Sequence, residues 1–107
     1  GIERPESLQG ESLSPVLRDA DARVRDTAMI NFHRFAINHD SFGEFYPIRC
    51  VTDGRYKLSI NLLESDEFYD LERDPYEMEN LADEEKHLEL RNKFSRQIDS
   101  LKKHYNN

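Results

Sequence analysis

The residues best suited to acid–base, nucleophilic or metal chemistry in this 107-residue chain are four histidines and one cysteine. His33, His39, His87 and His104 show none of the spacings of a zinc site, and Cys50 has no second cysteine for a metal site or an internal disulfide. The sequence contains neither a glycine-rich phosphate loop nor an EF-hand-like calcium loop. A Ser–His–Asp arrangement is recognised by geometry and cannot be assigned from spacing. Spacing alone therefore indicates no active site.

Two of the histidines flank a predicted turn at residues 36–42. In one interpretation, His33 and His39 are ordinary polar residues at a strand end. In the other, they face an anionic substrate together with Arg34 and Arg49, whose guanidinium groups suit anion binding. The residues alone leave both interpretations open.

Composition limits the partners of the chain. Its formal net charge is -7, which disfavours binding to nucleic acid or to an anionic membrane surface. No apolar run reaches the length of a membrane span. The acidic residues concentrate at positions 64–89 and are expected to form a solvated face. Only 36% of the residues are hydrophobic, so the core is thin. The chain is either a modest free-standing domain or a piece that completes its core against a larger partner.

Alternating apolar residues predict the strands of a sheet. The first strand is apolar on both alternate faces, which predicts a central position covered on both sides. Cys50 falls in the apolar alternation of the second strand and is expected to be a buried structural thiol. Asp53-Gly54 predicts a two-residue type I′ turn before the third strand. The predicted strands are residues 27–37, 46–52, 55–63 and 67–71.

A long C-terminal helix completes the predicted fold. Asn80 or Asp83 is expected to begin it, and His87 and His104 are expected to face solvent from it. Spacings of three and four residues give one apolar stripe, made of Leu90, Phe94, Ile98, Leu101 and Tyr105. The predicted fold class is α+β, with about four antiparallel strands forming one sheet and the long C-terminal helix packed on one face.

The region before the first predicted strand has a different character. Residues 1–11 read as a loop, and residues 19–26 as a charged connector. Between them a short helix is predicted, with Ser14 as its cap and Pro15 at its first helical position.

Three segments, in this order along the chain, resemble the C-terminal end of sulfatases, which are sulfuric ester hydrolases of the alkaline-phosphatase superfamily. Residues 9–17 are similar to a segment near the end of the catalytic domain in this family. Residues 48–58 are similar to its Arg-x-Val-x-x-x-x-Tyr-Lys hairpin. Residues 68–82 are similar to its LYDLxxDPxExxNLA stretch. Within the family, the set looks most like the iduronate and heparan N-sulfatases.

This resemblance implies a formylglycine nucleophile and a divalent cation, usually calcium. The family makes formylglycine from Cys or Ser in a Cys/Ser-x-Pro-x-Arg motif. The two nearest matches here depart from it: proline follows Ser14 directly, and Cys50-Val51-Thr52 has no proline. No catalytic or metal-binding residue is therefore expected in this chain, and the chain alone is expected to be inactive.

By the same resemblance, residues 1–26 are a linker and short helix from the end of the catalytic domain, and residues 27–107 are the sulfatase C-terminal subdomain. The implied partners are the N-terminal catalytic domain of the same polypeptide and, in the complete enzyme, a sulfated substrate such as a sulfated carbohydrate. The compartment is left open, although export to the periplasm or secretion is common in the family.

Two groups of residues follow from the resemblance. Loops of this subdomain can form part of the substrate-pocket rim in the family, and the candidates are His33, Arg34, Asn38, His39 and Arg49. The second group is expected to fix strands, turns and a helix start, and it comprises Tyr56, Lys57, Tyr69, Asp70, Asp74, Pro75 and Asn80. Replacing Asp74 or Asn80 by alanine is expected to lower stability by about 1 kcal/mol.

The alternative function is a free-standing acidic α+β module that binds another protein through the sheet face that the helix leaves uncovered. What precedes Gly1 distinguishes the two hypotheses, because a sulfatase requires an upstream domain with the formylglycine motif.

Overall fold

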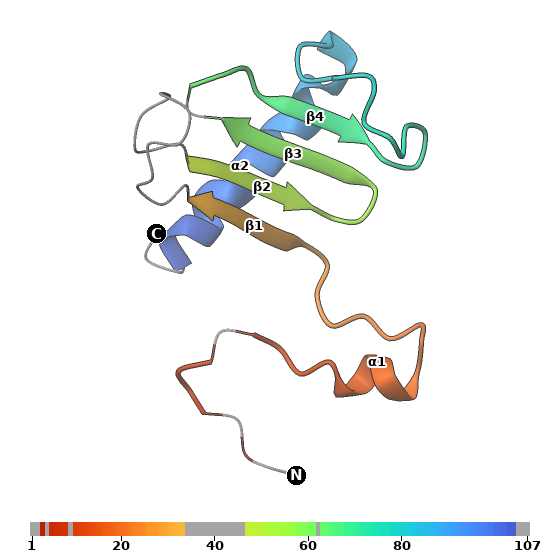
Figure 1. The fold of residues 1–107 in the computed structure, drawn as a ribbon, viewed down its shortest axis with the longest axis vertical. Helices are drawn as coiled ribbons and strands as arrows, with labels where there is room; N and C mark the ends of the chain where they lie inside the picture. The colour runs from red at the N-terminus through yellow and green to blue at the C-terminus, as the bar shows by residue number, and fades with distance from the viewer. Residues whose placement is uncertain (1–2, 4, 9, 34–46, 62, 105–107) are drawn as a thin grey trace, which may run out of the picture.

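The computed structural model describes residues 3, 5–8, 10–33, 47–61 and 63–104, and it describes His33 and Pro47 by their backbone alone. A four-stranded antiparallel sheet has the strand order β1-β2-β3-β4, and helix α2 crosses one of its faces (Figure 1). The predicted α+β class is confirmed. The elements are α1 (Ser14–Arg18), β1 (Ala28–His33), β2 (Pro47–Thr52), β3 (Tyr56–Asn61), β4 (Glu67–Asp70), the 3₁₀ helix η1 (Glu85–His87) and α2 (Leu88–His104).

The hydrophobic core lies between the sheet and α2. The aromatic ring of Phe68 stacks on Tyr56 with 5.7 Å between centroids and meets Phe94 edge-on at 5.9 Å. Such pairs stabilise a core beyond the area they bury. The predicted helical stripe is confirmed for its four described members, while Tyr105 lies outside the described residues. The buried core residues are Val51, Leu58, Phe68, Leu81, Ala82, Phe94 and Ile98.

The turn between β2 and β3 differs from the predicted type I′ hairpin. Three residues separate the strands, and among the described residues of this turn only Gly54 has positive φ, at 96°. The Asp53 carboxylate accepts hydrogen bonds from the backbone N–H groups of Arg55 and Tyr56, at 2.9 and 2.8 Å. This Asx-type bonding favours a wider loop over the two-residue turn.

Strand β1 lies at the end of the sheet order, so the prediction that it is central was wrong. It spans Ala28–His33, and the rest of the predicted strand lies outside the described residues. Met29 faces the helix side and packs against the core. On the opposite face, Ile30 and Phe32 are 56% and 53% exposed. One face of this doubly apolar strand therefore has no cover in the described part of the chain.

Strand β4 forms the other end of the sheet, and the chain that follows it returns along its outer side. The N–H of Leu81 donates to the carbonyl of Phe68 at 2.8 Å, and the N–H of Phe68 donates to the side chain of Asn80 at 3.0 Å. The returning segment thus occupies hydrogen-bonding groups that the end strand would otherwise expose.

The C-terminal helix begins later than predicted. The 3₁₀ helix η1 has Glu84 at its N-cap without a side-chain capping bond, and α2 continues from Leu88. Asn80 does not cap the helix, because its side-chain amide is engaged with β4. No helix in the described residues combines the length and apolar character needed to cross a bilayer.

The described residues before β1 form an arm that lies beyond the β1 edge of the sheet (Figure 1). Leu13 is the N-cap of α1, with no side-chain capping bond, so the prediction of Ser14 as the cap was wrong. Because the helix begins at Ser14, Pro15 is its second residue and not its first, so the prediction of its position was also wrong. Leu13 and Leu17 are 66% and 87% exposed. The arm therefore presents apolar side chains that the sheet and α2 do not cover.

Candidate functional site

The predicted substrate-rim residues are only partly described. His33 ends β1 and is described by its backbone, while Arg34, Asn38 and His39 lie outside the described residues. Arg49 lies in β2 on the side of Val51, which α2 covers, and its buried Nε has no hydrogen-bond partner in the described structure. The described residues therefore do not bring the rim candidates together, and their role stays a prediction.

The segment at residues 68–82, which resembles the sulfatase stretch, is built around Asp70, the last residue of β4. Arg55 donates from Nε and Nη2 to the two Asp70 oxygens, at 3.3 and 3.1 Å. The backbone N–H groups of Glu72 and Asp74 also donate to Asp70, the first to its side chain at 3.2 Å and the second to its carbonyl at 2.8 Å. The hydrogen bond from Arg55 lowers the pKa of the Asp70 carboxyl below its ordinary value. Asp70 is thus an ionised anchor for the turn after β4.

Asn80 bonds to three backbone groups on two segments, residues 66–68 and its own segment at Ala82. Its side-chain oxygen accepts from the N–H groups of Phe68 and Ala82, both at 3.0 Å. Its side-chain nitrogen donates to the carbonyl of Asp66 at 3.1 Å. The side chain therefore holds the segment after the turn against β4.

Asp74 closes the turn that precedes Asn80. Its Oδ2 accepts from the N–H of Glu79 at 2.8 Å, and its carbonyl accepts from the N–H of Glu77 at 3.2 Å. Pro75 follows it as an exposed residue of the turn.

Lys57 and Glu77 form an ion pair that short-range sequence patterns do not reveal. Lys57 Nζ donates to both Glu77 oxygens, at 2.6 Å from Oε2, and lies 5.8 Å from the centre of the Tyr69 ring. Glu77 has a φ of 55°, which is uncommon for a residue other than glycine. Burial raises the pKa of the Tyr69 hydroxyl, and the charges of Glu67 and Glu77 add to this rise.

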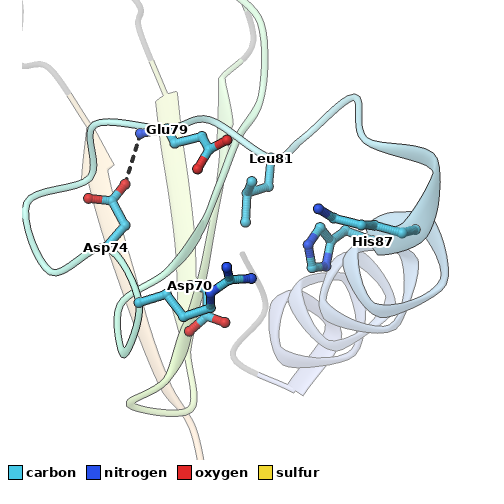
Figure 2. Close-up of a pocket in the computed structure, with 7 residues that line it drawn as sticks. Asp70, Asp74, Glu79, Leu81 and His87 are labelled. Atoms are coloured by element: carbon cyan, nitrogen blue, oxygen red, sulfur yellow. Dashed lines mark hydrogen bonds between the residues drawn. The ribbon is translucent and has the colours of Figure 1, made fainter.

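A cleft of about 170 Å³ lies between the segment after β4 and the start of the C-terminal helical region (Figure 2). Two of its carboxylates are already engaged, Asp70 by Arg55 and Asp74 by the Glu79 N–H. The described residues that line it include no hydroxyl or thiol nucleophile. The side chains of the cleft therefore hold the segment after β4 and the helical region together and are not arranged for catalysis. It is lined by Asp70, Arg73, Asp74, Glu79, Leu81, Lys86 and His87.

His87 is less exposed than the sequence suggested. Its side chain is 17% exposed, with its Nε2 3.7 Å from a Glu84 oxygen and its ring 6.2 Å from the ring of Phe68. The prediction that it faces solvent was wrong, because the 3₁₀ turn directs it toward the core. A second contact missed from the sequence joins Arg91 to Asp66 at 2.6 Å, across 25 positions.

Cation-binding chemistry has no candidate site in the described ranges, where no group of three or more His, Cys, Asp or Glu side chains is placed to hold a metal ion. Cys50 is buried, as predicted. The formylglycine motif is also absent from the full sequence. These residues therefore do not fit the cation and nucleophile that the sulfatase resemblance implies.

Comparison with known proteins identifies the family of this chain. Residues 1–104 match the family described as N-sulphoglucosamine sulphohydrolase, C-terminal. The chain is 42% identical over 93 residues to the uncharacterized sulfatase YidJ of Escherichia coli K12, covering 87% of this chain and 18% of that protein. It is 28% identical over 108 residues to an N-acetylglucosamine-6-O-sulfatase of Bacteroides thetaiotaomicron, covering 98% of this chain and 19% of that protein.

A solved structure of a 2-O GAG sulfatase is similar with a TM-score of 0.77 and 26% identity, covering 96% of this chain and 22% of that one. The chain thus spans about a fifth of the length of these relatives. Together, the sheet-and-helix fold and the match over residues 1–104 show that this chain belongs to the sulfatase family, as a C-terminal domain of the N-sulphoglucosamine sulphohydrolase type.

Proposed function

We propose that this chain is the non-catalytic C-terminal part of a longer sulfatase that hydrolyses sulfate esters of carbohydrates. The observation that carries the proposal is the family match over residues 1–104 in a sequence that lacks the formylglycine motif. Two relatives whose names specify carbohydrate positions, an N-acetylglucosamine-6-O-sulfatase and a 2-O GAG sulfatase, support the substrate class.

In this proposal, the upstream domain of the same polypeptide supplies the formylglycine and the calcium site. Residues 1–26 connect the two parts, and residues 27–107 form the C-terminal subdomain. The exposed apolar side chains of the arm support this division, since Leu13 and Leu17 lack cover in the described chain.

The full-length protein, produced with a formylglycine-generating system, tests the function. We expect it to release sulfate from a chromogenic aryl sulfate and from sulfated disaccharides. The 107-residue chain and a full-length variant with alanine at the formylglycine position are the controls, and both should be inactive. If the upstream sequence lacked the Cys/Ser-x-Pro-x-Arg motif and the full-length protein released no sulfate, the proposal that it is a sulfatase would be rejected.

The substrate-rim role is a separate part of the proposal. The guanidinium groups of Arg34 and Arg49 can donate charge-assisted hydrogen bonds to sulfate oxygens, and the imidazole of His39 can donate one when it is protonated. Replacing Arg34 by alanine in the full-length enzyme should raise KM about tenfold, the cost of one such bond, with little change in kcat. Lys103→Ala, at an exposed position near the end of α2, is the matched control. Equal KM values for the two variants would exclude Arg34 from the rim.

The interaction-module hypothesis remains the second candidate because Ile30 and Phe32 are exposed on the uncovered sheet face. It predicts a binding partner and no sulfate release from the full-length protein.

A further inference from the structure

We infer that the β1–β2 half of the uncovered sheet face docks on the upstream part of the same polypeptide. This patch comprises Ala28, Ile30, Phe32, Ile48, Cys50 and Thr52 and is called the β1–β2 patch below. The inference rests on the proposed function, because that proposal supplies the upstream domain. It adds the surface through which the two parts meet.

The strand register places the patch residues on one surface. Ile30 lies opposite Cys50, and Phe32 lies opposite Ile48, so their side chains share the face turned away from Met29 and α2. Ile30 and Phe32 are more than half exposed. The patch contains no charged residue, although 35% of the chain is charged.

The other half of the same face is already closed by its own chain. Lys57 holds Glu77 in an ion pair, Tyr69 is 8% exposed, and Ser59 is 7% exposed. The need for cover is therefore confined to the β1–β2 patch. An uncharged apolar partner surface suits it, because a charged one would lose hydration without gaining a partner.

The upstream polypeptide is the occupant that the chain itself favours. The family relatives are about five times longer than this chain, as the coverage of 18% and 19% shows. The arm leads directly into β1, so the upstream part is tethered beside the patch and binds at a high effective concentration. Leu13 and Leu17 of the arm are also exposed, which extends the uncovered apolar surface toward the upstream part.

Thiol labelling of the full-length protein tests this inference. In Phe32→Cys and, separately, Ile30→Cys, maleimide should react with the new thiol at least about a hundredfold more slowly than in the same protein in urea. Leu63→Cys, at a position 62% exposed outside the patch, should react within about tenfold of its rate in urea. Peptide mass spectrometry assigns each modified thiol.

Cys50 reports on folding in the same experiment, because it is only 6% exposed in this domain by itself. If Phe32→Cys unfolds the domain, Cys50 reacts fast as well, and Ile30→Cys then decides the outcome. Fast labelling at either patch position with slow labelling of Cys50 would overturn the inference.

Dilution distinguishes cover of the patch by the upstream part from cover by a second copy of the protein. Cover by the upstream part keeps labelling slow at every protein concentration, whereas cover by a second copy is lost as the protein is diluted. Dilution-dependent protection would therefore also overturn the inference. The labelling experiment does not depend on sulfate release. If the patch is protected but the protein has no sulfatase activity, the proposed reaction is rejected and the proposed docking surface still stands.

Discussion

At the scale of single residues, the most informative side chains are those whose hydrogen bonds join parts of the chain that lie apart in sequence. Asn80 connects positions 66, 68 and 82, and Asp70 connects Arg55 to the turn after β4. These polar side chains determine the path of the backbone where neither a strand nor a helix does so. Removing one leaves backbone groups without partners, which costs more than the bond itself contributes.

Asn80→Ala should lower the free energy of unfolding by about 2 kcal/mol, because three hydrogen bonds are lost, two of them from backbone N–H groups beside the core. Asp74→Ala should cost about 1 kcal/mol, since it loses one side-chain bond. Urea denaturation measures both. Asn92→Ala, at an exposed position of α2, is the control and should change stability little. A urea denaturation curve unchanged by Asn80→Ala would disprove the joining role of this side chain.

Because of Asp70, the free energy of unfolding should fall with pH in the acid range. Its folded-state pKa lies below the ordinary value of 3.8 because Arg55 hydrogen-bonds the carboxylate. Ionised Asp70 therefore stabilises the fold at pH values above the unfolded pKa, and this contribution is lost as pH falls through the lowered folded pKa.

Thermal melts of the native protein and of Asp70→Asn measure this effect. The difference in Tm should be constant near neutral pH and should shrink as pH falls below about 4. Asp83→Asn, at an exposed position, serves as the control. A Tm difference that stays the same down to the lowest pH would show that the charge of Asp70 is not what stabilises the turn.

At the scale of elements, the sequence predicted the parts that depend on local alternation. Tyr56, Leu58 and Ile60 alternate with polar residues, and β3 formed with those three on the helix side. The stripe of α2 was predicted for the same reason, since a periodic apolar face has one way to be buried. The start of the helix was predicted wrongly because the same amide, at Asn80, suits both a helix cap and a bond to β4.

The ion pair between Lys57 and Glu77 should couple β3 to the turn after β4. A double-mutant cycle with Lys57→Met and Glu77→Gln should give a coupling free energy of about 1 kcal/mol, because the two side chains are 24% and 35% exposed. The Glu84–Lys86 pair is the comparison, with Lys86 66% exposed and an expected coupling of about 0.3 kcal/mol. A coupling for Lys57 and Glu77 no larger than that of the comparison pair would show that the turn is held without this contact.

At the scale of the whole molecule, the sequence could not show which surfaces are covered. The doubly apolar β1 predicted cover on both sides, and the described residues cover only one side. In the docking proposed above, the upstream part supplies the missing cover, and this domain by itself contains no sign of that. The rim candidates around residue 38 have the same dependence, because their role needs a substrate and a second domain.

Trypsin should remove the arm before it cuts the sheet. Arg18, Arg23 and Arg25 are exposed and precede β1, while Lys57 and Arg91 are half-buried and lie in regular structure. Limited digestion of the 107-residue chain, followed by mass spectrometry, should first yield a product beginning at Asp19, Val24 or Asp26. In the full-length protein the same three sites should be cut more slowly if the arm lies against the upstream domain. Early cleavage at Lys57 or Arg91 would contradict the division between residues 1–26 and 27–107.

The two end strands of the sheet carry different risks of aggregation while the protein is synthesised and folds. The returning segment at Asn80 and Leu81 protects β4 from pairing with another molecule, whereas the face of β1 bears exposed Ile30 and Phe32. A ribosome synthesises the upstream part of the proposed polypeptide first, and domains commonly fold in that order. The surface that covers β1 would then already exist when β1 emerges, so aggregation would threaten only a chain that is expressed without it.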